Sequence, residues 1–179
     1  MGLIMDILKR CRWLIVVFIA AGLLPYQLRH CAGVEARWKA VRVIDGDSII
    51  LEKAGRLYEV RLAGIDAPEL GWKDRPAQPF AVESKEHLEK LVECESLDVK
   101  VIDRDRYGRL LVVIFCDGDN INLKMVEDGM AEYYRGRPSL DISIYRLAEE
   151  EARRKALGIW SQKYYISPRI WRRMHPRRW

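Results

Sequence analysis

Histidine and cysteine are scarce in this chain of 179 residues, which has three histidines and four cysteines. This scarcity argues against a histidine-rich metal site and against a zinc-ribbon framework, because both need several clustered nitrogen or sulfur ligands. The sequence also has no internal repeats and no sign of a second domain. Its 49% hydrophobic and 32% charged residues are typical of a globular protein, which excludes a wholly disordered, collagenous or polytopic membrane protein.

Acidic residues are missing from the C-terminal end, where five arginines and two tryptophans stand within residues 169–179. The net charge of +5 comes from the two ends, because residues 1–33 contribute +3 and the last segment +5, leaving −3 for residues 34–168. We expect the tail, residues 167–179, to be disordered, since its prolines bracket too few residues to build a core. Arginine and tryptophan suit nucleic acid or an anionic membrane surface, and we favour nucleic acid slightly.

Residues 1–36 have the form of an export signal or a membrane anchor. A basic stretch at residues 9–12 precedes an almost wholly apolar run at residues 13–24. A basic segment followed by about 7–15 apolar residues is typical of a secretory signal, whereas a membrane-spanning helix needs about 20. We therefore expect an exported protein, periplasmic or secreted, or one that an uncleaved N-terminal segment tethers to the membrane. Cleavage and retention both stay open.

Residues 37–166 have the pattern of one β-rich domain. The loop at residues 64–79 is polar and contains prolines, which excludes a single regular element there. The element order βββ-α-ββ-α-α indicates an α+β, mainly β fold, a five-stranded Greek-key barrel with about three helices packed on it. The periodicity predicts strands at residues 38–44, 48–53, 57–63, 97–102 and 110–116, and helices at residues 80–92, 121–128 and 142–157.

Three clusters of charged residues lie at turns and strand ends of this predicted barrel, at residues 44–48, 61–69 and 103–109. Each alone is weak evidence, because Asp-Gly is a common hairpin turn and a charged turn is usually just solvated. Together their carboxylates make a hard-oxygen site that suits Ca²⁺ or Mg²⁺ rather than zinc. Their arginines offer forked donors that match phosphate oxygens. A cation, two arginines and a spare carboxylate are the parts needed to split a phosphodiester.

At these residues the sequence resembles the staphylococcal nuclease family, Ca²⁺-dependent nucleases with an OB fold. The motifs that carry the resemblance are Ile-Asp-Gly-Asp at 44–47, Arg-Leu-x-Gly-Ile-Asp-Ala-Pro-Glu at 61–69, Asp-Arg-Tyr-Gly-Arg at 105–109, Asn-Leu-x-x-Val-x-x-Gly-Met-Ala at 122–131 and Gly-Ile-Trp-Ser at 158–161. The resemblance covers residues 38–162. It implies an enzyme that hydrolyses phosphodiester bonds of DNA and RNA with low sequence specificity, and we expect single strands to be preferred.

The resemblance also implies a cation site and a catalytic set. Glu69 would be the general base for the attacking water, or at least its orienter, and the arginines would hold the scissile phosphate. Asp45 belongs to the motif but is expected to fix the turn rather than bind metal. The implied Ca²⁺ ligands are the side chains of Asp47 and Asp66 with the backbone carbonyl of Ala67, and the implied catalytic set is Arg61, Glu69 and Arg109.

Four further residues are implied to bind substrate. Arg106 and Tyr107 match residues near a terminal phosphate of the bound nucleotide, and Tyr133 or Tyr134 would stack or hydrogen-bond there. The motif spacing does not choose between those two tyrosines. The loop at residues 70–79 departs from the family in length and composition, so the resemblance does not extend to substrate positioning there.

Two other classes of protein compete with an enzyme. A catalytically silent, nucleic-acid-binding module of the same fold is the nearest, but such modules typically lose the acidic and arginine residues together, and here all five principal side chains are present. A membrane-associated structural protein would explain only the two ends of the chain. We therefore expect a nuclease that acts as a monomer and that could contact an anionic membrane through the N-terminal segment or the tail.

Cys94 and Cys116 are predicted to form a disulfide. An antiparallel register centred on the turn at residues 103–109 puts Cys116 opposite residue 96 or 97, which leaves Cys94 within reach. An exported protein meets the oxidising setting that the bond needs. Two separate buried thiols are the alternative, because a small error in the register would part the two side chains.

Overall fold

The structure is a computed structural model that describes residues 37–136 and 140–176. The predicted N-terminal export segment lies outside these residues. In the part of the chain that is described, no helix combines the length and the hydropathy needed to cross a membrane.

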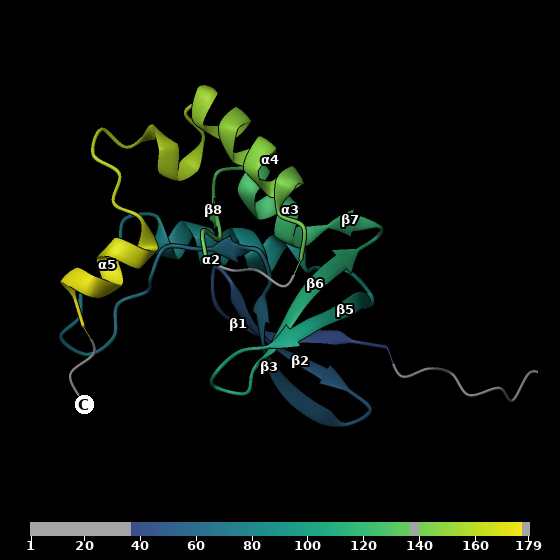
Figure 1. The fold of residues 1–179 in the computed structure, drawn as a ribbon. Helices are drawn as coiled ribbons and strands as arrows, with labels where there is room; N and C mark the ends of the chain where they lie inside the picture. Colours follow the sequence, from purple (N-terminus) through teal and green to yellow (C-terminus); the bar gives the residue numbers. More distant parts are fainter. Residues whose placement is uncertain (1–36, 137–139, 177–179) are drawn as a thin grey trace, which may run out of the picture. The chain divides into compact units, whose positions relative to one another are not determined.

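A five-stranded barrel forms the body of the domain (Figure 1). The strand order is β1-β2-β3-β6-β5, and every neighbouring pair is antiparallel except β3–β6, which is parallel. A bridge between Trp38 and Leu97 joins β5 to the start of β1 and closes the sheet. The predicted OB-type barrel is thus confirmed. Its strands are β1 (Lys39–Asp45), β2 (Ser48–Lys53), β3 (Arg56–Leu62), β5 (Leu97–Arg104) and β6 (Leu110–Cys116).

Alternate residues of these strands fill the barrel, as the alternation in the sequence predicts. Ile49 and Leu51 of β2, and Val112 and Ile114 of β6, are wholly buried. Three shorter strands lie outside the barrel path. They are β4 (Ile65–Asp66) and β8 (Glu132–Tyr133), which pair with each other, and β7 (Asp119–Asn120), which pairs with β6. The strand β4 lies inside the loop predicted to be irregular, because two residues are too few to leave a periodic signal.

The three predicted helices are present as α2 (Ala81–Leu91), α3 (Ile121–Glu127) and α4 (Ser143–Arg154), and a 3₁₀ turn, η1 (Gly158–Ser161), follows them. Asn122 pins α3 to the barrel, since its buried side chain accepts from the Ile114 amide and donates to the carbonyl oxygens of Ala63 and Val112. The Asn-Leu motif therefore has a structural role. It satisfies backbone groups that would otherwise be buried without partners.

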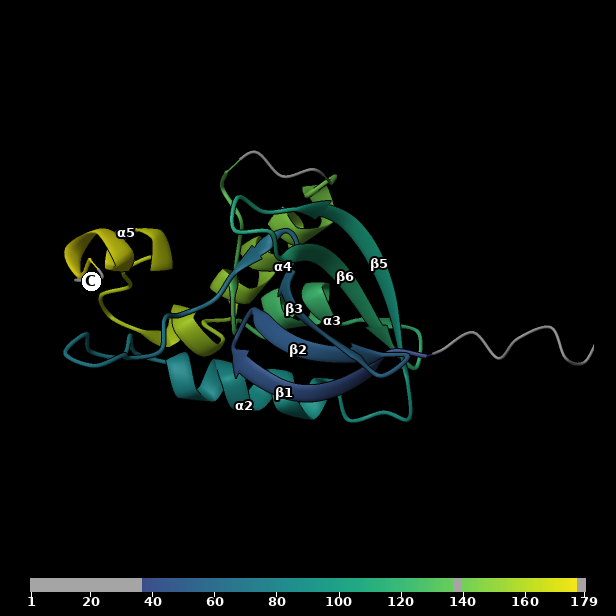
Figure 2. The same cartoon turned by 90° about the horizontal axis from the view of Figure 1, so that it is seen from below.

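The prediction of a disordered tail is wrong, because residues 168–174 form a helix, α5 (Pro168–Met174). The Ser167 hydroxyl caps it by accepting from the Ile170 amide at 3.3 Å. Pro168 occupies the first turn, where a fixed φ suits a helix and the missing N–H costs nothing. In both views α5 lies beside the loop that leads from β4 to α2 (Figures 1 and 2).

Two glycines lie backbone to backbone where α3 ends and η1 begins. The Ile159 amide donates to the Gly129 carbonyl oxygen at 2.9 Å. Both glycines have positive φ, 67° for Gly129 and 48° for Gly158. A Cβ on Gly158 would stand 2.2 Å from the Gly129 oxygen, so no larger residue fits without moving the backbone. This contact fixes the chain that follows α4 against the end of α3.

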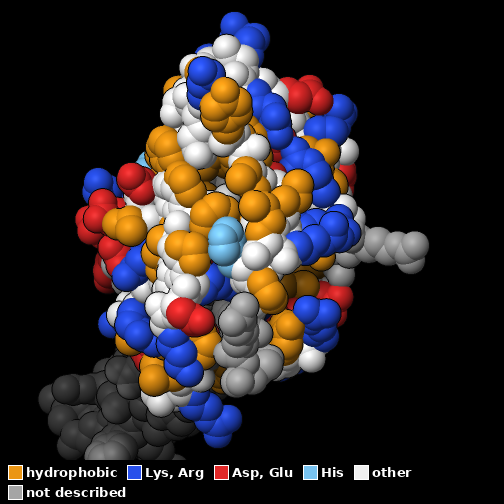
Figure 3. Space-filling model, turned by 90° about the vertical axis from the view of Figure 1, so that its left-hand side faces the viewer, with side chains coloured by type: hydrophobic (Ala, Val, Ile, Leu, Met, Phe, Trp, Pro, Cys, Tyr) orange, Lys and Arg blue, Asp and Glu red, His pale blue; other side chains and the backbone are white. Residues whose placement is uncertain are grey.

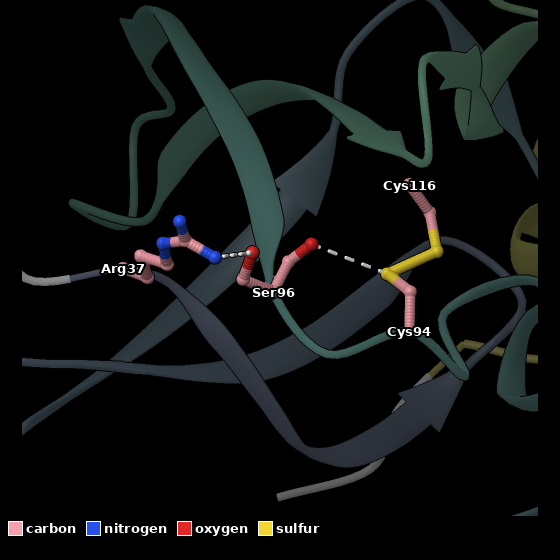
Figure 4. Close-up of a disulfide and its surroundings, with 4 residues drawn as sticks. All are labelled: Arg37, Cys94, Ser96 and Cys116. Atoms are coloured by element: carbon pink, nitrogen blue, oxygen red, sulfur yellow. Dashed lines mark hydrogen bonds between the residues drawn. A yellow bond between two sulfur atoms is a disulfide. The ribbon is translucent and has the colours of Figure 1, made fainter.

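A disulfide joins Cys94 and Cys116, the pair predicted from the sequence, with 6.1 Å between their Cα atoms (Figure 4). The register of β5 and β6 pairs Leu97 with Cys116, so the cysteine that follows α2 reaches the end of β6. The bond therefore ties the end of α2 to the barrel near its closing bridge.

Removal of this disulfide is expected to destabilise the fold without touching the candidate site. The two cysteines are 22 residues apart in sequence. The loss of a cross-link around a loop of that length costs about 3 kcal/mol of unfolding free energy. Denaturant unfolding of Cys94→Ser with Cys116→Ser, against the parent protein, measures this loss. Alkylation of the native protein without reductant is the companion measurement, and two thiols open to the reagent would contradict the bond.

Candidate functional site

The turn between β1 and β2 aims Asp47 into the molecule. The Asp45 carboxylate accepts from the Asp47 amide at 3.0 Å, so Asp45 shapes the turn, as expected. The Leu62 amide donates to the Asp47 carbonyl oxygen at 2.8 Å and holds the turn against β3. Gly46 packs so closely that a Cβ there would lie 1.9 Å from the Ser84 hydroxyl. Only glycine lets this turn sit on α2.

Arg61 joins the carboxylates of Asp47 and Asp66. Its two terminal nitrogens donate to Asp47 Oδ1 at 2.7 Å and to Asp66 Oδ1 at 2.9 Å. The Ser48 hydroxyl and the Ala67 amide also donate to Asp47, each at 3.0 Å. The residues from two of the predicted motifs therefore meet in one cluster.

Burial strongly disfavours the charge on Asp47. Desolvation, helped by the nearby carboxylates of Asp45 and Asp66, raises the pKa of Asp47 from 3.8 to about 7, although Arg61 and the Ala67 amide act in the opposite direction. Both predicted metal ligands are nearly inaccessible, at 3% exposure for Asp47 and 2% for Asp66. A second positive charge at this point would offset the cost of keeping both carboxylates ionised.

Glu69 follows this pair and is held from several directions. The Glu69 amide donates to Gln78 Oε1 at 3.1 Å, and the Gln78 amide donates to the Glu69 carbonyl oxygen at 2.9 Å. Its carboxylate forms an ion pair with Arg75 through one oxygen and with Arg172 through the other. Both Arg75 and Gln78 come from the loop at residues 70–79, where the resemblance does not reach. This loop therefore fixes the predicted base.

Arg172 enters the cluster from α5. Its guanidinium donates to both oxygens of Asp66, at 3.0 and 2.7 Å, and to Glu69 Oε1 at 2.6 Å. Burial alone would lower the pKa of Arg172, but the hydrogen bonds and charges of Asp66 and Glu69 outweigh it and raise that pKa. The cluster thus contains three carboxylates and three guanidiniums, of which only Arg61 was predicted among the basic groups.

Arg109 lies in the turn that directly precedes β6, and it has no contact with the carboxylates of the cluster among the interactions of the described residues. The parallel register pairs Arg61 with Leu111, two residues beyond Arg109. Arg109 donates to Asp105 at 2.8 Å and lies 3.6 Å from a carboxylate oxygen of Glu59. Partial burial acts to raise the pKa of Asp105, but hydrogen bonds from Arg109 and from the Tyr107 amide lower it. The structure therefore places the second predicted arginine beside the site, in a turn that its own aspartate orders.

The predicted substrate-binding residues lie outside the cluster, in the β5–β6 turn and in and just after β8. Tyr107 is 71% exposed, and Arg106 stacks over its ring with 4.8 Å to the centroid. Tyr133 pairs with Ile65 in the small sheet, and the Tyr134 amide donates to the Gly64 carbonyl oxygen. Within the described chain neither tyrosine ring hydrogen-bonds to the cluster, so the choice between them stays open.

The side chains of the cluster supply only some of the oxygen ligands that a hard cation needs. Among the described residues, no three Asp, Glu, His or Cys side chains form a ready metal cluster. Asp47 and Asp66 supply the carboxylate oxygens, and Ca²⁺ takes six to eight oxygens that include backbone carbonyls and water. A cation here would therefore need main-chain oxygen, the role predicted for Ala67, and water.

Sequence reasoning missed Arg75, Gln78 and Arg172. Arg75 and Gln78 stand in a loop that matches no motif, and nothing in their spacing points to Glu69. For Arg172 one signal was available, since Ser167 followed by Pro168 is a helix start. A helix there would have suggested that its arginines pair with acidic residues elsewhere in the fold. The sequence does not indicate which acidic residues these are.

Comparison with known proteins bears on what this cluster does. The family model described as staphylococcal nuclease homologue matches residues 59–162. An "Uncharacterized endonuclease" of Haemophilus influenzae is 37% identical over 147 residues, which cover 82% of this chain and 78% of that protein. A "Micrococcal nuclease" of Shigella flexneri is 37% identical over 153 residues, 79% of this chain and 83% of the relative. "Protein ParB" of Escherichia coli is 36% identical over 165 residues, 86% of this chain and 89% of the relative.

Proposed function

The chain belongs to the staphylococcal nuclease family and is an endonuclease, and from this premise we propose that it is Ca²⁺-dependent and cleaves DNA and RNA with little sequence preference. The observation that carries the proposal is the Arg61 bridge, which holds the carboxylates of Asp47 and Asp66 side by side next to Glu69. A catalytically silent binding module would have no use for buried carboxylates that are costly to keep ionised.

The residues of the cluster, together with Arg109, divide the work of hydrolysis. Asp47 and Asp66, with the Ala67 carbonyl, would hold Ca²⁺, which supplies Lewis-acid stabilisation of charge on the phosphate when it is bound. Glu69 takes a proton from water, or orders that water, for attack on phosphorus. Arg61 and Arg109 donate to the phosphoryl oxygens, whose charge grows as the fifth bond forms.

We propose that single strands are the better substrates. Arg106 and Tyr107 stand together at the exposed tip of the β5–β6 turn, joined by a hydrogen bond of 2.8 Å. An aromatic ring and a guanidinium can contact a base and a phosphate of a flexible strand without reading base edges. Such contacts read phosphate and the faces of bases rather than base edges in a groove, so low sequence preference is expected.

Removal of Ca²⁺ is expected to abolish cleavage. Denatured DNA and RNA are incubated with the enzyme in Mg²⁺ with the calcium-selective chelator EGTA, in Ca²⁺, and in Ca²⁺ with excess EGTA. We expect activity only with available Ca²⁺, because two carboxylates and main-chain oxygens suit the larger, more flexible coordination of that ion. Undiminished cleavage in Mg²⁺ with EGTA would reject the Ca²⁺ assignment while leaving the nuclease itself in place.

We also propose that the enzyme works outside the cytoplasm. The Cys94–Cys116 disulfide supports this, because such bonds persist in oxidising compartments and are rare in reduced ones. The basic and apolar pattern of residues 1–36 points the same way. Fractionation of the source cells, followed by an activity assay of each fraction, tests the location.

A further inference from the structure

We propose that Arg172 is the built-in counter-ion of the cation site. Ca²⁺ and Arg172 occupy the carboxylate of Asp66 in turn, and Arg172 therefore sets the affinity of the enzyme for its metal. The inference rests on the proposed function, because it takes Asp66 as a ligand of Ca²⁺.

The contacts of Arg172 use the same atoms that a cation needs. Its two terminal nitrogens lie 3.0 and 2.7 Å from the two oxygens of Asp66, and one of them lies 2.6 Å from Glu69. Asp66 Oδ1 also accepts from Arg61, so this carboxylate receives three hydrogen bonds. A Ca²⁺ ion bound to Asp66 at the usual distance of about 2.3–2.6 Å from oxygen would lie at most about 5.6 Å from the nearest Arg172 nitrogen. Two positive groups so close together repel each other, and the repulsion is strong because the Asp66 carboxylate between them is buried.

The charges of the cluster favour exchange over joint occupancy. The carboxylates of Asp47, Asp66 and Glu69 face the guanidiniums of Arg61, Arg75 and Arg172. With all three carboxylates ionised, the cluster has no net charge. A divalent cation that entered beside all three arginines would leave two positive charges in excess. If Arg172 leaves as the cation enters, the excess is one. One positive charge matches the single negative charge of a phosphodiester.

The helix that carries Arg172 has other attachments. Gln78 Nε2 donates to the Ile166 carbonyl oxygen at 2.7 Å, and the Tyr165 hydroxyl donates to Glu132 Oε2 at 2.7 Å. Pro168, at the start of α5, is buried. These contacts do not involve Arg172, whose side chain is 35% exposed and so has a way out towards solvent. The arginine can release the carboxylates while α5 stays at the rim of the site.

The same helix supplies a matched control. Figure 3 shows the molecule from the side on which α5 lies, where Lys and Arg side chains surround a band of hydrophobic ones. Arg173 follows Arg172 directly, is exposed, and has no ion pair among the described residues. Its replacement removes the same charge from the same helix without touching Asp66 or Glu69. Any difference between the two variants therefore reports the contacts of Arg172 rather than the net charge.

The experiment measures Ca²⁺ affinity by isothermal titration calorimetry of the full chain, without nucleic acid, for the parent protein, Arg172→Ala, Arg172→Lys and Arg173→Ala. We expect Arg172→Ala to bind Ca²⁺ about tenfold more tightly, since partly exposed, charge-assisted hydrogen bonds to Asp66 no longer compete. Arg172→Lys should lie between, because an ammonium cannot bind both oxygens as a fork. Arg173→Ala should stay within about twofold of the parent.

Equal or weaker Ca²⁺ binding by Arg172→Ala would overturn the inference, and weaker binding would mean that Arg172 orders Asp66 for the metal. If the parent protein and all variants fail to bind Ca²⁺, the proposed metal itself is wrong, which is a separate result.

An NMR measurement on the parent protein tests the same inference without any variant, and so does not depend on whether a variant folds. Addition of Ca²⁺ should shift the Arg172 Nε–H resonance and speed its exchange with water while the Arg173 signal stays in place. An unmoved Arg172 signal at saturating Ca²⁺ would also overturn the inference.

Discussion

Glu69→Gln is expected to lower kcat by about 10²–10⁴, the usual contribution of a positioned general base, while nucleotide binding persists. The amide keeps the shape of the carboxylate but cannot take a proton. In the parent protein the guanidiniums of Arg75 and Arg172 share the Glu69 carboxylate. The glutamine keeps one acceptor oxygen for these two guanidiniums.

Steady-state kinetics on denatured DNA measure this effect, with Glu86→Gln as the control. Glu86 is an exposed residue of α2. Its replacement by glutamine removes the same charge at a position away from the cluster. A Glu69→Gln enzyme with near-normal turnover would show that another group activates the water.

Arg61→Lys is expected to lower kcat/KM by about 10²–10³ and also to destabilise the fold. A lysine ammonium cannot bridge two carboxylates and still bind a phosphate as a fork. Arg61 is 19% exposed, and its partners Asp47 and Asp66 are 5% and 3% exposed in their side chains. A buried carboxylate left without its partner costs about 1–3 kcal/mol, so the melting temperature should fall as well.

Arg109→Lys separates the two effects. Its partners are the Asp105 side chain, 14% exposed, and Glu59, 51% exposed, so the loss of these pairs should cost at most about 1 kcal/mol. We therefore expect an activity loss comparable to that of Arg61→Lys with an almost unchanged melting temperature. Equal destabilisation by both variants would mean that Arg61 is no more structural than Arg109, contrary to its place between two buried aspartates.

The barrel and half of the cluster could be predicted because their signals are local. Alternation in β2 and β3 marks the inward faces, and the Asp-Gly turn marks the hairpin between β1 and β2. The Arg61 pair with Asp66 spans five residues across one strand end. Such short-range patterns can be recognised in the sequence without knowledge of the long-range contacts of the fold.

The other half could not be predicted, because its contacts join distant segments. Arg172 reaches Asp66 across 106 residues and Glu69 across 103. An ion pair at such a separation has no period and no fixed spacing. The tail was expected to be disordered since it is too short to form its own core. It is ordered because it contacts residues of the loop and of the cluster. The number of apolar residues in the tail does not predict these contacts.

The backbone contact between Gly129 and Gly158 has a consequence for how relatives of this chain are sorted. Two of the five motifs, those at residues 122–131 and 158–161, hold the helices against the barrel and touch none of the cluster's carboxylates. A descendant that abandoned hydrolysis would still need these glycines to keep its fold, whereas it could lose Glu69 and still fold. The glycine pair therefore marks ancestry alone, and only the carboxylates and arginines of the cluster tell a working nuclease from a silent descendant.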